Sequence, residues 1–182
     1  MILSSRLSIV AIAAALTVSG CSMLSSSSTK ERTGDLGCPQ VGIIRDLSQI
    51  TNFRPGKRDL ADVISHAEIA DFKGDCTYDG KGVSISVAVA LVAERGPAFT
   101  GSQADYTYFV AIANPENRIL AKQEFSTAVE FKNGAPRAGT REELTQAIPL
   151  AVDEDGRGYR VMLGFQLTPE QIEFNRRATA KK

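Results

Sequence analysis

The residues from Val83 to Ala93 alternate between large apolar and small side chains along one continuous segment. The large residues share one parity and the small residues share the other: Val83, Ile85, Val87, Val89 and Leu91 against Ser84, Ser86, Ala88 and Ala90. A period of two is typical of a β-strand, because successive strand side chains point to opposite faces of a sheet. The pattern predicts a central strand with its large face in a hydrophobic core and little room on its small face.

Six further segments have apolar alternation and are separated by turn residues. They cover residues 41–53, 64–78, 106–113, 119–131, 144–150 and 159–167. Asp79-Gly80 predicts a hairpin before Val83, Gly74 predicts a bulge or bend, and Pro149 predicts a strand at a sheet edge. Seven strands joined by short turns, without helices between them, predict an all-β sandwich; a closed β-barrel is the alternative.

The segment from Ile148 to Leu163 resembles the E–F corner of immunoglobulin-like and fibronectin type III domains. In those domains a tyrosine opens strand F after an apolar strand and a turn, so the resemblance implies that Tyr159 is the corner tyrosine. The chain departs from the pattern because it has no tryptophan and because Cys38 and Cys76 both lie in its first half. The strand order is therefore expected to differ from those domains.

A short helix is predicted at about residues 169–178, after the last strand. Thr168 suits the N-cap position, and Gln171 three residues later completes a capping box. Glu173 can pair with Arg177 one turn further along the helix.

Residues 1–20 have the parts of an export signal: Arg6 as the only charge, an apolar run over residues 7–18, and small residues before Cys21. The run Val18-Ser19-Gly20-Cys21 resembles the lipobox of bacterial lipoproteins. The resemblance implies that the signal is cleaved before Cys21 and that this cysteine carries the lipid. An ordinary signal peptide with a chance cysteine is the alternative. In Gram-negative lipoproteins an aspartate directly after the lipidated cysteine is typical of retention in the inner membrane. This chain has Ser22 there, so the resemblance implies the outer membrane.

The rest of the chain divides into a tether and one domain. Residues 21–36 are polar and rich in serine, which predicts a flexible tether. Residues 37–182 have the length of a single domain with its own core. Three runs resemble a family of proteobacterial envelope lipoproteins, and this resemblance implies no particular activity: Gly37–Gln40, Ala93–Pro97 and Gly164–Thr168.

Cys38 and Cys76 remain once Cys21 is assigned to the lipid. An exported protein meets an oxidising compartment, so we expect a disulfide between them. A metal site and a redox pair are the alternatives. His66 is the single histidine, which leaves a metal site short of ligands, and redox pairs usually have C-x-x-C spacing. No metal and no cofactor are expected.

Two groups of residues are candidates for binding. Arg54, Lys57 and Arg58 place three cations in a loop that could contact lipid headgroups, phosphates or another anionic partner, or could simply be solvated. Tyr106 and Tyr108, with Phe99, could form an exposed aromatic contact surface, or could belong to the core or a sheet face.

Catalytic arrangements do not stand out. The paired carboxylates are Glu142-Glu143 and the acidic run 153–155, and solvated loop acids are the main interpretation; weak calcium binding by the acidic run is an alternative. His66 could be a ligand contact or a half-exposed strand residue that pairs with Glu68. The charges balance at 21 basic and 21 acidic residues, which argues against a nucleic-acid partner.

These observations favour a lipid-anchored envelope protein on the periplasmic face of the outer membrane. The first hypothesis is a non-catalytic binding or assembly module that presents a loop end or a sheet edge to another envelope protein. The second is an envelope hydrolase that acts on peptidoglycan or glycan through carboxylates such as Glu142 and Asp155. The third is a small-ligand carrier with a barrel-like interior.

Overall fold

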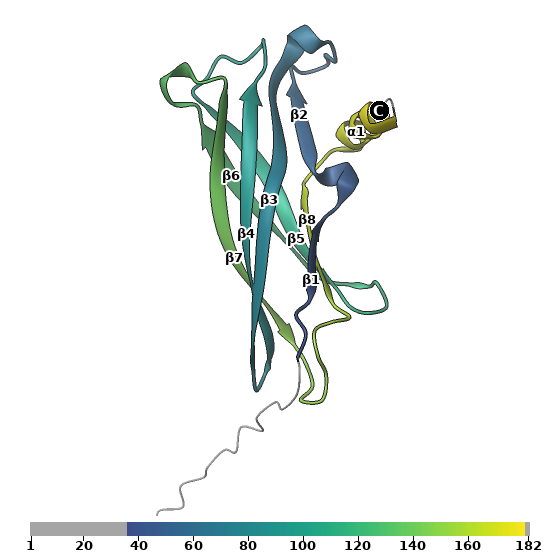
Figure 1. The fold of residues 1–182 in the computed structure, drawn as a ribbon. Coiled ribbons are helices and arrows are strands. Elements are labelled where there is room, and N and C mark those ends of the chain that lie inside the picture. Colours follow the sequence, from purple (N-terminus) through teal and green to yellow (C-terminus); the bar gives the residue numbers. More distant parts are fainter. Residues whose placement is uncertain (1–35, 181–182) are drawn as a thin grey trace, which may run out of the picture.

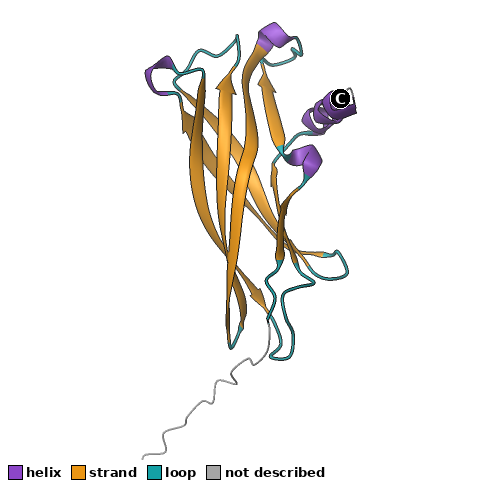
Figure 2. Cartoon of the chain, viewed as in Figure 1, coloured by secondary structure: helices purple, strands orange, loops and turns teal. Residues whose placement is uncertain are grey.

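Two four-stranded sheets pack face to face in this protein (Figures 1 and 2). The computed structural model describes residues 36–180, so the predicted signal peptide, Cys21 and nearly all of the predicted tether lie outside it. One sheet has the order β1 (Gln40–Ile43), β8 (Arg160–Phe165), β5 (Gln103–Ala113) and β6 (Ile119–Glu130). The other has the order β2 (Gln49–Phe53), β3 (Val63–Asp79), β4 (Gly82–Arg95) and β7 (Arg137–Pro149). The predicted all-β sandwich is confirmed, and the barrel alternative is not what the chain forms.

Strand β4 lies between β3 and β7, as its alternation predicts. Its large residues are buried between the sheets, and its small residues face outward. The hairpin between β3 and β4 is also confirmed. The Asp79 carboxylate closes it by accepting hydrogen bonds from the backbone N–H groups of Lys81 (2.8 Å) and Gly82 (3.0 Å).

The predicted first strand, residues 41–53, is in fact two strands in different sheets. β1 runs parallel to β8, and β2 runs antiparallel to β3. A 3₁₀ turn, η1 (Arg45–Leu47), separates them. The Leu47 side chain lies over Gly164, where a Cβ atom would come within 2.8 Å of the Leu47 Cβ. Apolar alternation runs through both strands, so it could not reveal that the chain changes sheets.

The register shift in β3 lies between Ile69 and Asp71, so β3 has no bulge at Gly74. Gly74 instead permits close packing, because a Cβ there would lie 2.7 Å from Val41 Cγ2. The bulge reverses the parity of β3, since an extra residue moves every later side chain to the other face. Ile69 faces the core before it, and Lys73 pairs with the outward-facing Ala88 after it.

Strand β7 begins at Arg137, well before the predicted start at residue 144. It pairs with β4 along its whole length and has no strand of the described chain on its other side, so the edge position predicted from Pro149 is confirmed. Long polar side chains interrupt its alternation, and this is why its first half did not appear as a strand.

The disulfide between Cys38 and Cys76 is present, with the two Cα atoms 5.8 Å apart. It ties the segment before β1 to β3, close to the β3–β4 turn. Tyr78 strengthens the same junction, because its hydroxyl donates to Gly37 O (2.6 Å) and accepts from Gly156 N–H (2.6 Å). The described chain therefore enters the domain at the end that carries this turn.

Helix α1 (Pro169–Ala180) follows β8 and packs beside β2 and η1 (Figure 1). The capping box forms: Thr168 N–H donates to Gln171 Oε1 (2.9 Å), and Gln171 N–H donates to Thr168 Oγ1 (3.3 Å). Phe174 meets Phe53 edge to face, with ring centroids 5.2 Å apart. None of the helices within residues 36–180 has both the length and the hydropathy needed to cross a bilayer.

Tyr159 is buried just before β8, with its hydroxyl donating to Glu154 Oε1 (2.7 Å). In immunoglobulin-like domains the corner tyrosine bonds to backbone and another strand follows. Here the partner is a carboxylate, and β8 is the last strand of the described chain. The strand order thus differs from those domains, as expected from the positions of the cysteines.

Candidate functional site

The three predicted cations lie in the loop between β2 and β3. Arg54, Lys57 and Arg58 are exposed; Arg54 pairs with Asp62 (3.6 Å), and the Arg58 guanidinium lies 5.6 Å from the Phe53 ring centroid. β3 runs from this loop to Cys76, thirteen residues beyond Val63, or about 43 Å at 3.3 Å per residue. The cationic loop is therefore at the end of the sandwich opposite the disulfide (Figure 1).

Tyr106 and Tyr108 belong to the core, so they do not form an exposed aromatic contact surface. Their side chains are 2% and 1% exposed. Tyr108 stacks on Phe125 (centroids 5.5 Å apart), and Phe99 meets Phe131 rather than either tyrosine (5.0 Å). Burial raises the pKa of both phenols, that of Tyr108 to about 12. The inward-facing parity of β5 was the sequence feature that pointed to the core.

The carboxylates proposed for a hydrolase do not come together. Glu142 lies on β7 rather than in a loop, and its Oε1 accepts a hydrogen bond from Thr127 Oγ1 (2.6 Å). Asp155 lies in the β7–β8 loop. The next residue in this loop, Gly156, bonds to Tyr78, which is level with Ile148 in the sheet, so Asp155 lies near the Ile148 end of β7. Ile148 lies six positions along the strand from Glu142, about 20 Å at 3.3 Å per residue. Glycosidase carboxyls are about 5–9.5 Å apart.

The acidic run in the β7–β8 loop is engaged by its own loop. Asp155 accepts a hydrogen bond from Arg157 N–H (2.9 Å) and pairs with the Arg157 side chain (3.5 Å). Glu154 accepts the Tyr159 hydroxyl. Over residues 36–180, no cluster of three or more His, Cys, Asp or Glu side chains is placed to hold a metal ion. His66 Nδ1 lies 2.9 Å from Thr51 Oγ1 on the neighbouring strand.

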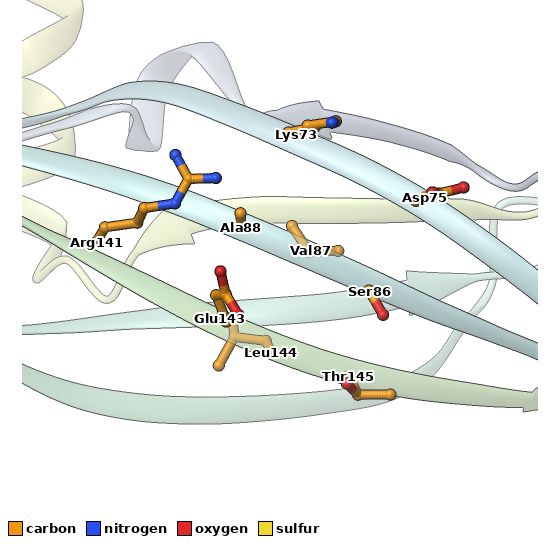
Figure 3. A pocket seen from close by; sticks show the side chains of 9 residues that line it. All are labelled: Lys73, Asp75, Ser86, Val87, Ala88, Arg141, Glu143, Leu144 and Thr145. Atoms are coloured by element: carbon orange, nitrogen blue, oxygen red, sulfur yellow. The ribbon is translucent and has the colours of Figure 1, made fainter.

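A groove of about 510 Å³ crosses the outer face of the β2-β3-β4-β7 sheet. Its floor is β4, where the outward side chains Ser86 and Ala88 are small. Lys73 and Asp75 of β3 form one wall (Figure 3). The other wall comes from β7: Arg141, Glu143 and Thr145.

Strand pairing explains why the groove exists. Ala88 lies between Lys73 on β3 and Glu143 on β7, so a short side chain is flanked on both sides by long ones. The bulge after Ile69 is required for this arrangement, because without it Lys73 would share the inward parity of Ile69. The small outward parity of β4 was visible in the sequence, but the flanking charges depend on the bulge and on the full length of β7.

The groove carries two cations and two anions, and most of them are free to meet a ligand. Lys73, Arg141 and Glu143 are exposed, and within the described chain none of their side chains makes a hydrogen bond or an ion pair. The Asp75 carboxylate accepts only a local bond from Cys76 N–H (2.8 Å). Such a surface can pair with a ligand that carries both signs of charge, and exposed charges of this kind contribute specificity more than affinity.

The fold and the groove define an all-β sandwich with a mixed-charge groove on the outer face of one sheet. Comparisons with protein-family models, curated proteins and solved structures found no match for this chain. Its function must therefore be inferred from its own residues.

Proposed function

We propose that this protein is a lipid-anchored, non-catalytic binding module of the bacterial cell envelope. Cys21 would carry the lipid at the periplasmic face of the outer membrane, and the mixed-charge groove would bind a segment of another envelope protein. The observation that carries the proposal is the groove itself, with Lys73, Arg141 and Glu143 all exposed and unpaired among the described residues. The lipobox resemblance and the disulfide both fit an exported protein.

The direction in which the chain enters the domain supports this arrangement. Anchoring through Cys21 would hold the sandwich by the end at which Cys38 and Cys76 are joined. The predicted tether has about 15 residues, with a root-mean-square reach of about 20 Å. The groove would then lie near the middle of β4, and the loop between β2 and β3, which lies at the end of β3 opposite Cys76, would point away from the anchoring membrane. Contact between that loop and headgroups of the same membrane is therefore not part of the proposal.

The alternative functions have less support. The hydrolase hypothesis needs two neighbouring carboxyls, whereas Glu142 lies about 20 Å along β7 from Ile148, the end of the strand near which the loop of Asp155 lies. The carrier hypothesis needs an interior space, and the space between the sheets is packed with large side chains that include Tyr108 and Phe165.

The anchor is tested by mass spectrometry of the protein taken from envelope membranes. We expect an acylated N-terminal residue at Cys21, and we expect Cys21→Ser to move the protein from the membrane fraction to the soluble fraction. An unmodified Cys21 in membrane-associated protein would refute this part of the proposal.

The groove is tested by site-specific photo-crosslinking in intact cells. A crosslinker at Ala88, on the groove floor, should capture a discrete envelope protein; one at Asp105, exposed on the other sheet, should not. The double charge reversal Lys73→Glu/Arg141→Glu should reduce the Ala88 adduct about tenfold, while Lys57→Glu, at the far end, should leave it unchanged. Equal capture from Ala88 and Asp105, or no effect of the double reversal, would refute binding in the groove.

A further inference from the structure

Strand β6 has one edge that pairs with nothing in the described chain. All of residues 119–124 are exposed, and Ile119 and Leu120 at its start are two of the three large hydrophobic residues within 36–180 that are more than half exposed. A long, exposed strand edge is a template for pairing with another strand.

The other sheet edges in residues 36–180 are better protected. β1 and β2 have only four and five residues, and α1 packs beside β2. β7 carries Pro149, and Thr127 of β6 donates to its Glu142. Short strands, proline and covering elements are the usual means of blocking an edge. The first half of β6 has none of these three; its protection is limited to the charges of Lys122 and Glu124 and to a register shift opposite its first residues.

The hydrogen-bond pattern shows which backbone groups of β6 are available. Phe131 N–H donates to Ser102 O (2.7 Å), and Gln103 is paired with Glu130. Hydrogen-bonded and non-hydrogen-bonded pairs alternate in an antiparallel ladder. The odd-numbered residues of β6 therefore direct their N–H and C=O groups toward β5, and the even-numbered residues direct theirs to the free edge. A strand added there must form its hydrogen-bonded pairs with even-numbered residues such as Lys122 and Glu124.

We propose that two copies of this chain pair through antiparallel β6 strands about a two-fold axis at Gln123. This register places Lys122 of each copy opposite Glu124 of the other, and both are even-numbered, as the free edge requires. Within one copy Lys122 Nζ already pairs with Glu124 Oε1 (2.9 Å) and donates to Gln166 Oε1 (2.6 Å), so the dimer would join two existing ion pairs into one cluster of alternating charge. Registers centred on residue 122 or 124 would instead set Lys122 against Lys122 or Glu124 against Glu124. Opposite charges directly across a strand pair stabilise it, and like charges destabilise it. Phe125 would lie opposite Ala121 on the inner face.

The position of this axis suits a protein held by one end. Gln123 is four residues from Ile119, about 13 Å, so it lies near the β5–β6 turn. That turn meets the β7–β8 loop, since a Cβ on Gly158 would lie 2.8 Å from Pro115 Cγ, and the same loop contacts Pro39 through Gly156. The two copies would therefore overlap at their disulfide ends and project in opposite directions, so a tethered dimer would lie along the membrane with both tethers at its centre, whereas a single copy would stand upright.

Cysteine crosslinking in the full-length protein in its own cells tests the register. Gln123 would face Gln123 of the second copy in a non-hydrogen-bonded pair, with Cα atoms about 4.5 Å apart, within disulfide range. Gln123→Cys should give a disulfide-linked dimer on a non-reducing gel. Ala121→Cys is the matched control, because it is exposed on the same face of the same strand but lies opposite Phe125, and it should give none. Co-expressed Ala121→Cys and Phe125→Cys chains should crosslink to each other.

Charge variants test the pairing itself. In the Gln123→Cys background, Lys122→Glu and Glu124→Lys should each reduce the dimer about tenfold, and the two together should restore it. Equal crosslinking by Gln123→Cys and Ala121→Cys, an adduct with the mass of a different protein, or failure of the double variant to recover would each overturn the proposal. The interface uses no groove residue and needs no lipid, so its failure would leave the proposed binding function untouched.

Discussion

The hydroxyl of Thr127 donates a 2.6 Å hydrogen bond to the carboxylate of Glu142 and so joins the edge strands of the two sheets. Thr127 is 9% exposed and Glu142 is half-buried. Elsewhere the sheets meet mainly through apolar side chains, whereas this polar contact ties β6 to β7 on the open side of the sandwich. Burial is the main cause of the raised pKa of Tyr108, and the negative charge of Glu142 raises that pKa further.

Thr127→Val should therefore destabilise the fold, because it keeps the side-chain shape and leaves the carboxylate without its closest donor. We expect the free energy of unfolding to fall by about 1 kcal/mol, at the low end for such losses since Glu142 is partly solvated. Urea unfolding measures this value. Ser126→Ala, on the exposed neighbouring residue, should change it by less than about 0.5 kcal/mol. Equal effects of the two variants would contradict a specific role for this bond.

The Cys38–Cys76 disulfide closes a loop of 38 residues. In the chain-entropy model a loop of this size stabilises the folded state by about 4 kcal/mol, through its effect on the unfolded chain. The Cys38→Ser/Cys76→Ser variant should lose about that much in urea unfolding. Reducing agent should lower the wild-type value by a similar amount and should leave the variant unchanged. A response of the variant to reducing agent would contradict this account.

The sequence predicted the parts of the fold that depend on neighbouring residues. The alternation of Val83 to Leu91, the Asp79-Gly80 hairpin and the Thr168–Gln171 capping box are each local patterns, and each is present. The disulfide was predictable because the lipobox resemblance leaves only two cysteines.

The features that the sequence did not reveal depend on distant contacts. Residues 41–53 keep one apolar pattern although the chain crosses between sheets at η1, where Leu47 packs on Gly164. The bulge after Ile69 has no glycine to mark it, so the outward turn of Lys73 could not be foreseen. The groove combines this bulge with the pairing of β7, where Arg141 is 68 residues beyond Lys73, and no local pattern contains that pairing.

Gln171 links the start of α1 to the sandwich. It completes the capping box with Thr168, and its Nε2 donates to Asn52 Oδ1 (3.2 Å) on β2. Gln171→Ala removes the acceptor for Thr168 N–H and the contact with Asn52, but it keeps the bond from Gln171 N–H to Thr168 Oγ1. Thr168→Ala removes only that last bond, the N-cap, worth about 1 kcal/mol of helix stability. Amide hydrogen exchange should show faster exchange throughout α1 in both variants, more so for Gln171→Ala. Glu173→Ala, which removes the exposed pair with Arg177, should have the smallest effect.

The hydrogen bond from Tyr159 to Glu154 predicts how stability depends on alkaline pH. This bond, aided by burial and by nearby negative charge, raises the pKa of Tyr159 to about 12. The folded state then holds the phenol proton more tightly than the unfolded chain, where the pKa is about 10. The stabilisation is complete below pH 10 and is lost as the pH rises toward 12.

Urea unfolding should show that the unfolding free energies of the wild type and Tyr159→Phe differ by a constant amount from pH 7 to 9. Above pH 10 the wild type should lose stability faster, so the difference should shrink. A difference that stays constant to pH 11.5 would rule out this linkage. Both proteins should share the remaining alkaline loss from Tyr106 and Tyr108, whose pKa values burial also raises.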